Sequence, residues 1–127
     1  MEIFIRQGGA QVPKVILDKE KNRFEISGHS LPEDVFSFYN PILEWLDNYM
    51  KSPNENTEFV LKMSYFNTAS SKMIYEILNR LSILYENGHN VRVKWYYADD
   101  DEDMEEAGKE YAEMVDIPFD FIPYPAD

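Results

Sequence analysis

The sequence contains no cysteine among its 127 residues, which excludes disulfide bonds, thiolate catalysis and cysteine-based zinc sites and fits a reducing compartment. It also lacks an apolar run that approaches the length of a membrane span. The N-terminal residues 1–6 show no basic segment followed by an apolar one, as a secretion signal would. We therefore expect a soluble, cytoplasmic protein.

Basic residues are scarce, and they are almost absent from the C-terminal part of the chain. There are 12 Lys and Arg against 24 Asp and Glu, for a net charge of −12. Residues 1–98 hold 12 acids and 11 bases, whereas residues 99–127 hold 12 acids and only Lys109. Because nucleic acids and anionic membranes bind basic surfaces, we expect neither as a partner.

The sequence also lacks a recognisable catalytic set. Gly8-Gly9 is not a Gly-rich phosphate loop, and no nucleophile, base and orienting group come together in a known motif. We therefore expect a binding protein and not an enzyme, and we predict no cofactor.

The composition is that of one packed domain spanning residues 1–127. The chain is 44% hydrophobic and carries 8 Phe, 9 Tyr and 2 Trp, which is enough apolar surface for a single core. We expect no second domain.

The first part of the chain predicts strands followed by a helix. Residues 2–5 favour a short strand, and residues 14–17 and 23–27 flank a polar turn as in a β-hairpin. The pattern Ser30-Leu-Pro-Glu33 matches a capping box at a helix start. Pro41 leaves two alternatives: a short turn before a helix that begins near Asn40, or one helix that bends.

The central part predicts a right-handed βαβ unit. Residues 57–64 form a largely apolar strand, and residues 73–85 repeat apolar side chains at helical spacing up to Asn87-Gly88. Residues 91–96 alternate as a second strand, which we expect to be parallel to the first.

A third amphipathic helix covers residues 104–115, with acids crowding its first turn, and residues 119–122 predict a last strand. The predicted order is ββ(β)αβαβαβ. We therefore expect an α/β domain, a mixed sheet with helices packed against it.

The stretch Ser64 to Lys72, where the first central strand passes into its helix, is the candidate functional site. Seven of its nine side chains carry a hydroxyl, an amide or an amine, and the helix start supplies N–H groups that suit an anion. One of these residues is needed as a helix cap, but one helix does not need Asn67 and four hydroxyls, those of Ser64, Thr68, Ser70 and Ser71.

The acidic run Asp99 to Asp103 leaves a different alternative open, a divalent-metal site, since carboxylate oxygens bind hard cations. Its spacing does not match an EF-hand. The simpler interpretation is that these acids lie in the first turn of a helix, where the positive end of the helix dipole favours negative charge.

Three tracts together resemble the SiaC family of bacterial regulatory phosphoproteins: Tyr65 to Lys72, Val91 to Tyr97, and Asp99 to Gly108. The resemblance extends from about Pro13 to Ile122, with the tracts in the family's order. It implies a STAS-like single domain, with a fold like that of anti-anti-sigma factors. Those factors usually carry Asp-Ser at the phosphorylated position, whereas this chain has Asn67-Thr68.

The resemblance further implies a phosphorylation switch at Thr68. A partner kinase would phosphorylate this threonine and a PP2C-type phosphatase would restore it. The unphosphorylated form would bind and activate a diguanylate cyclase that controls biofilm formation through cyclic di-GMP.

Our leading hypothesis is therefore a non-enzymatic switch. Its docking surface contains six residues of the strand-to-helix junction: Tyr65, Asn67, Thr68, Ser70, Ser71 and Lys72. The alternatives are a small metal-dependent enzyme that uses Asp99 to Asp103, and a constitutive adaptor that is never modified.

Overall fold

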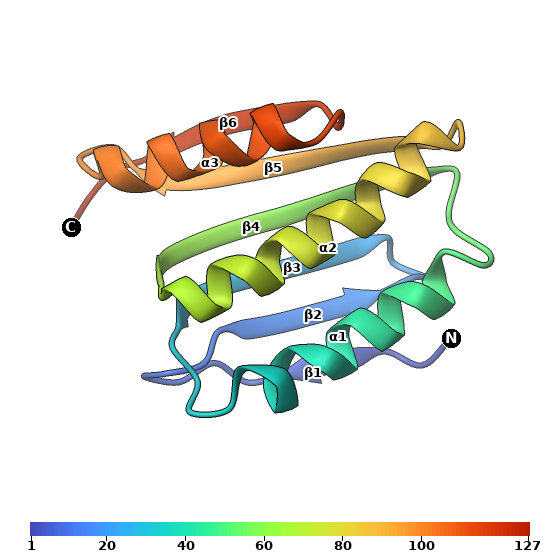
Figure 1. The fold of residues 1–127 in the computed structure, drawn as a ribbon, viewed down its shortest axis with the longest axis horizontal. Helices are drawn as coiled ribbons and strands as arrows, with labels where there is room; N and C mark the ends of the chain where they lie inside the picture. Colours follow the sequence, from blue (N-terminus) through green and yellow to red (C-terminus); the bar gives the residue numbers. More distant parts are fainter.

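The computed structural model describes residues 1–127 and shows one sheet of six strands with three helices (Figure 1). The elements follow the order βββαβαβαβ, so the predicted α/β fold class and element order are confirmed. Their bounds are β1 Phe4–Arg6, β2 Lys14–Asp18, β3 Arg23–Ser30, α1 Val35–Tyr49, β4 Asn56–Phe66, α2 Thr68–Glu86, β5 Asn90–Ala98, α3 Glu102–Met114 and β6 Phe119–Tyr124.

The strands lie in the sheet in the order in which they occur in the chain. β1, β2 and β3 are antiparallel, as predicted for the hairpin, and its turn places Asn22 at a φ of 52°, in the left-handed region that asparagine tolerates. From β3 to β6 every neighbouring pair is parallel, and α1, α2 and α3 each connect one parallel strand to the next. The predicted parallel pairing of β4 with β5 is thereby confirmed.

All three helices cover the same face of the sheet (Figure 1). Along β4 the buried side chains alternate with exposed ones, so that Phe59 and Leu61 face the helices while Glu58 and Lys62 face solvent. The core therefore lies in one layer between sheet and helices, and the other face of the sheet is open.

The predicted start of the first helix is wrong. Ser30 ends β3 with its side chain buried, and α1 begins five residues later at Val35. Its N-cap is Asp34, whose carboxylate accepts a hydrogen bond from Ser37 N at 3.1 Å. Ser37 Oγ also donates to Asp34. Of the two alternatives for Pro41, the structure has one continuous helix with the proline inside it.

α3 approaches the sheet closely because it carries Gly108 where it crosses β5. A Cβ at this position would lie 2.5 Å from atoms of the Trp95 indole. The same indole donates a hydrogen bond from Nε1 to the carbonyl of Met104 at 2.9 Å. A side chain at residue 108 would push the helix away from this contact.

Candidate functional site

The candidate site lies at the edge of the sheet where the parallel strands have their carboxyl ends. β4 ends at Phe66, Asn67 caps the next helix, and Thr68 is its first residue, so the predicted strand-to-helix junction is where the structure places it. Thr68 and Tyr65 are exposed, the latter by 49%. This edge is the common place for ligands and partners of parallel sheets.

Each of the three helices begins at this edge with an N-cap side chain that accepts a hydrogen bond from the backbone N–H three residues on, and only the cap of α2 is uncharged. Asp34 and Asp101 cap α1 and α3 with carboxylates, the second accepting from Met104 N at 3.0 Å. Asn67 caps α2 with a neutral amide, whose oxygen accepts from Ser70 N at 2.8 Å, and the first turn of α2 contains no acid. The positive end of its dipole is therefore not compensated.

Thr68 presents its hydroxyl at this uncompensated helix start. Ser70 N is bonded to the cap, but the backbone N–H groups of Thr68 and Ala69 have no acceptor within the helix. A negative group on the Thr68 side chain would lie beside these N–H groups, where the helix dipole favours it.

Ser70 points inward and belongs to a buried hydroxyl network. Its Oγ donates to the carbonyl of Ser30 at 3.0 Å and accepts from Ser30 Oγ at 2.9 Å, while Tyr39 OH is bonded to Ser30 Oγ at 2.5 Å. All three side chains are completely buried, and burial raises the pKa of Tyr39. A direct contact between Ser70 and a partner, as we predicted, does not fit this burial, because the side chain is out of reach.

This network also fixes the position of the candidate site. Asn67 N donates to the carbonyl of Ser30 at 3.0 Å, so the cap and the first turn of α2 are both tied to the end of β3. Thr68 therefore stands on a rigid support, although it is itself exposed.

Ser71 is half-buried and connects α2 to α3. Its Oγ donates to the carbonyl of Thr68 at 2.7 Å, and its own carbonyl accepts from Tyr111 OH at 2.7 Å. Burial raises the pKa of Tyr111 well above its usual range, because the charged phenolate would lose its hydration there. The backbone next to Thr68 is therefore held by a side chain of α3.

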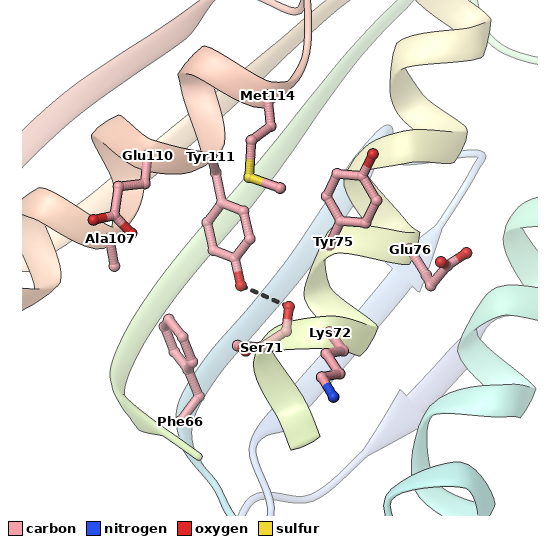
Figure 2. Close-up of a pocket in the computed structure, with 9 residues that line it drawn as sticks. All are labelled: Phe66, Ser71, Lys72, Tyr75, Glu76, Ala107, Glu110, Tyr111 and Met114. Atoms are coloured by element: carbon pink, nitrogen blue, oxygen red, sulfur yellow. Dashed lines mark hydrogen bonds between the residues drawn. The ribbon is translucent and has the colours of Figure 1, made fainter. Parts of the chain in front are cut away.

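A groove of about 610 Å³ lies between α2 and α3 and reaches Ser71 and Lys72 at one end (Figure 2). Its lining is mostly apolar, and at its mouth Met114 is 58% exposed. The nine lining residues are Phe66, Ser71, Lys72, Tyr75, Glu76, Ala107, Glu110, Tyr111 and Met114. The groove begins one helical turn from Thr68, so one partner can cover both.

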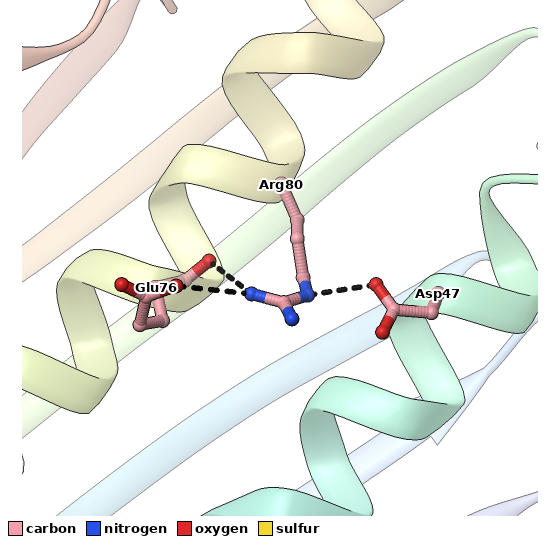
Figure 3. A network of polar contacts seen from close by, with 3 residues as sticks. All are labelled: Asp47, Glu76 and Arg80. Atoms are coloured by element: carbon pink, nitrogen blue, oxygen red, sulfur yellow. Dashed lines mark hydrogen bonds and ion pairs between the residues drawn. The ribbon is translucent and has the colours of Figure 1, made fainter.

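Lys72 is exposed and forms no ion pair in the structure, which contains seven ion pairs elsewhere. Glu76, four residues further along α2, has the spacing to pair with Lys72. Glu76 instead forms an ion pair with Arg80 at 3.3 Å, and Arg80 forms a second one with Asp47 of α1 at 2.8 Å (Figure 3). The network formed by Asp47, Arg80 and Glu76 thus leaves Lys72 with its charge unmatched.

The sequence interpretation missed the groove and the network of buried hydroxyls. Tyr111 was predicted on the apolar face of α3, and this position is confirmed, but nothing local indicates that its hydroxyl reaches Ser71. The exposed Met114 is the one local signal, an apolar side chain just where the helix should be polar.

The acidic run has separate tasks in the structure. Asp101 caps α3, and Asp99 accepts a hydrogen bond from Ala126 N at 3.2 Å. No group of three or more His, Asp or Glu side chains is placed to hold a metal ion. None of the helices has the length and apolar character needed to cross a membrane.

The fold and the site define a small α/β domain that presents one threonine, beside an apolar groove, at an uncompensated helix start. A family profile described as "SiaC family regulatory phosphoprotein" matches residues 6–124. The chain belongs to the SiaC family of regulatory phosphoproteins. The predicted family is thereby confirmed.

Proteins of Pseudomonas aeruginosa resemble this chain in sequence and in fold. An uncharacterised protein of strain UCBPP-PA14 is 26% identical over 112 residues, covering 88% of this chain and 89% of that protein. The structure of apo-SiaC superposes with a TM-score of 0.88 at 24% identity, over 96% of this chain and 99% of that one. SiaC in complex with the diguanylate cyclase SiaD, which it activates, superposes with a TM-score of 0.91 at 24% identity, over 95% of this chain and 99% of that one.

Proposed function

We propose that this protein is a phosphorylation-controlled activator of a diguanylate cyclase, with Thr68 as the modified residue. The unmodified form binds the cyclase through Tyr65, Asn67, Thr68, Ser71 and Lys72, with Ser70 supporting this surface from beneath. A partner kinase and a PP2C-type phosphatase set the proportion of the two forms. The activity thereby links a protein kinase signal to cyclic di-GMP and biofilm formation.

The observation that carries this proposal is the position of Thr68. It is the first residue of α2, exposed, and flanked by a neutral cap in a first turn without acids. Among the other aliphatic hydroxyls of the junction, that of Ser70 is buried and that of Ser71 is bonded to the carbonyl of Thr68. Ser64 is exposed but lies on β4 and not at the helix start. A kinase therefore finds one hydroxyl that is both reachable and surrounded by groups that stabilise the product.

The phosphoryl transfer changes the charge of this surface. The kinase moves a phosphoryl group from a nucleoside triphosphate to Thr68 Oγ, which loses its proton, and the phosphatase later hydrolyses the ester with water. The phosphate adds about −1.5 to −2 charges at neutral pH. A partner that packs over the bare hydroxyl would have to accommodate this bulky dianion in the contact, and binding would be lost.

The support from relatives concerns the partner. SiaC of Pseudomonas aeruginosa has been crystallised with the cyclase SiaD as its activator, and its fold matches this chain over nearly the whole length. A cyclase is therefore the partner class that we propose for this chain.

Substitution of Thr68 tests the proposal. Thr68→Ala should bind the cyclase of the same organism and activate it as the wild type does, but should carry no phosphate in the cell. Thr68→Asp should bind at least about tenfold more weakly, because it places a charge in the contact. Isothermal titration calorimetry and cyclic di-GMP production measure both effects, and intact mass spectrometry of protein from its native cells detects the phosphate.

Ser64→Asp is the matched control, since Ser64 is an exposed hydroxyl in the same junction but lies on the strand. It should bind as the wild type does. If Thr68→Asp binds equally well, the switch is not at Thr68, and an absence of phosphate under all growth conditions would favour a constitutive adaptor. The metal-enzyme alternative is tested separately by calorimetric titration with Mg²⁺ and Ca²⁺.

A further inference from the structure

Lys72 lies between two parts of the molecule that the proposed function uses. It is four residues after Thr68, so both side chains lie on the same side of α2, one turn apart. It also lines the groove between α2 and α3. Figure 2 shows its amine directed toward the start of the helix, as side chains of helical residues generally are.

The charge of Lys72 is kept available by neighbouring residues. Glu76 would otherwise pair with it across one turn. Instead the guanidinium of Arg80 donates to both the backbone carbonyl and the carboxylate of Glu76, and also to the carboxylate of Asp47. Only 23% of the Arg80 side chain is exposed, so packing holds the arginine in place between its two carboxylate partners, which are 54% and 47% exposed. Figure 3 shows Glu76 turned toward Arg80 and α1.

The groove next to Lys72 determines what kind of partner fits. Phe66, Tyr75 and Met114 offer apolar surface of a size that accepts one or two large apolar side chains. Lys72 on its α2 side offers an unmatched positive charge, and a carboxylate is the group that complements it.

We propose, as a deepening of the proposed function on which it rests, that Lys72 exchanges partners between the two states of the switch. In the unmodified protein it pairs with a carboxylate of the target, while an apolar side chain of that target fills the α2–α3 groove. After phosphorylation the ammonium group pairs with the phosphate on Thr68, and the target loses its counter-charge at the same time as it meets a dianion.

The first experiment uses the protein alone. Phosphothreonine is installed at position 68, and its ³¹P signal is titrated with pH in the wild type, in Lys72→Gln and in Lys51→Gln. Lys51 follows α1 and bonds only to Asn48, so its loss changes the net charge equally but far from the switch. The phosphate should titrate at a lower pH in the wild type and in Lys51→Gln than in Lys72→Gln, since a nearby cation favours the dianion.

The second experiment measures binding of the unmodified variants to the diguanylate cyclases of the same organism. Lys72→Gln should bind about fivefold more weakly, whereas Lys72→Arg and Lys51→Gln should bind as the wild type does. The salt dependence of binding should decrease only in Lys72→Gln. Circular dichroism and thermal unfolding establish that all variants are folded.

Two outcomes overturn the inference. Equal ³¹P titrations in all three proteins show that Lys72 does not pair with the phosphate, and wild-type affinity in Lys72→Gln shows that it does not pair with the target. Either result leaves the proposed function standing if Thr68→Asp still binds the cyclase at least about tenfold more weakly than the wild type. If Thr68→Asp also binds normally, the proposed function fails as well.

Discussion

Tyr111 is the residue that joins α3 to the first turn of α2. Its hydroxyl donates to the carbonyl of Ser71 at 2.7 Å, in a site where burial raises the pKa of the phenol. Tyr39 has the same character on the other side of α2, where it is bonded to Ser30. In the folded protein both phenols therefore favour their neutral form.

The buried tyrosines predict a loss of stability at alkaline pH. In the unfolded chain a tyrosine ionises near pH 10, whereas in the folded protein Tyr111 and Tyr39 hold their protons to higher pH. The unfolded state thus binds fewer protons above about pH 10, and the free energy of unfolding falls as the pH rises. Urea unfolding from pH 8 to 11 should show this decrease.

Tyr111→Phe isolates one part of the effect. At pH 7 the substitution should lower the free energy of unfolding by about 1 kcal/mol, because the hydrogen bond to Ser71 is lost. Above about pH 10 the free energy of unfolding of this variant should fall less steeply with pH than that of the wild type. Equal slopes in the two proteins would mean that Tyr111 ionises as freely in the folded state as in the unfolded one.

At the scale of single residues, the sequence predicts types of role better than their partners. It indicated that Asn67 or a neighbouring hydroxyl caps the helix, and Asn67 does so because its side chain reaches the N–H three residues on. It did not reveal that Ser70 is buried, because the partner hydroxyl belongs to Ser30, 40 residues away.

At the scale of elements, the contact between α3 and β5 depends on Gly108. The indole of Trp95 lies against the helix backbone at this point, with ring centroids 5.6 Å from Tyr111 and 6.4 Å from Phe66. Tyr111 and Phe66 also line the groove, so the close approach of α3 sets the width of the groove beside Thr68.

Gly108→Ala should destabilise the protein, although alanine normally favours a helix by about 1 kcal/mol over glycine. The added Cβ would lie 2.5 Å from the indole, and we expect a net loss of about 1 to 3 kcal/mol in urea unfolding. The fluorescence of Trp95 should change with it. Gly9→Ala is the control, because a Cβ there has no atom closer than 4.0 Å, and it should leave stability nearly unchanged. A more stable Gly108→Ala protein would show that α3 can move away without cost.

Element types were predictable here, and element starts were less so. The hydrophobic spacing of α2 and α3 and the alternation of β5 are local signals, and all three elements are confirmed. The start of α1 was misplaced because Ser30-Leu-Pro-Glu33 and Asp34 both offer a side-chain cap. Burial of Ser30 against Tyr39 decided between them, and burial is a tertiary property.

At the scale of the whole molecule, negative charge is concentrated in α3 and its flanks. On the open face of the sheet the charges are paired, for example Arg92 with Asp120 at 2.7 Å, which lowers the pKa of this carboxyl. On α3, by contrast, Glu106 stands one turn from both Glu102 and Glu110. Like charges at this spacing repel each other by a few tenths of a kcal/mol a pair.

Salt should therefore stabilise the protein. Raising NaCl from about 20 mM to about 500 mM shortens the screening length from about 21 Å to about 4 Å and should increase the free energy of unfolding by about 1 kcal/mol. Glu106→Gln should show a smaller increase, whereas Glu20→Gln, in the exposed hairpin turn, should behave as the wild type does. A decrease with salt would mean that the ion pairs of the sheet outweigh the repulsion on α3.

The sequence by itself determined the number, type and order of the elements and the place of the threonine at a helix start, because hydrophobic periodicity and caps depend on residues a few positions apart. Only the tertiary structure decided that Ser70 is buried, that Arg80 keeps Glu76 from Lys72, and that a groove adjoins Thr68. These features arise where segments such as Ser71 and Tyr111, 40 residues apart, come into contact. Contacts between such distant segments depend on how the helices pack on the sheet, and no pattern of neighbouring residues encodes this packing.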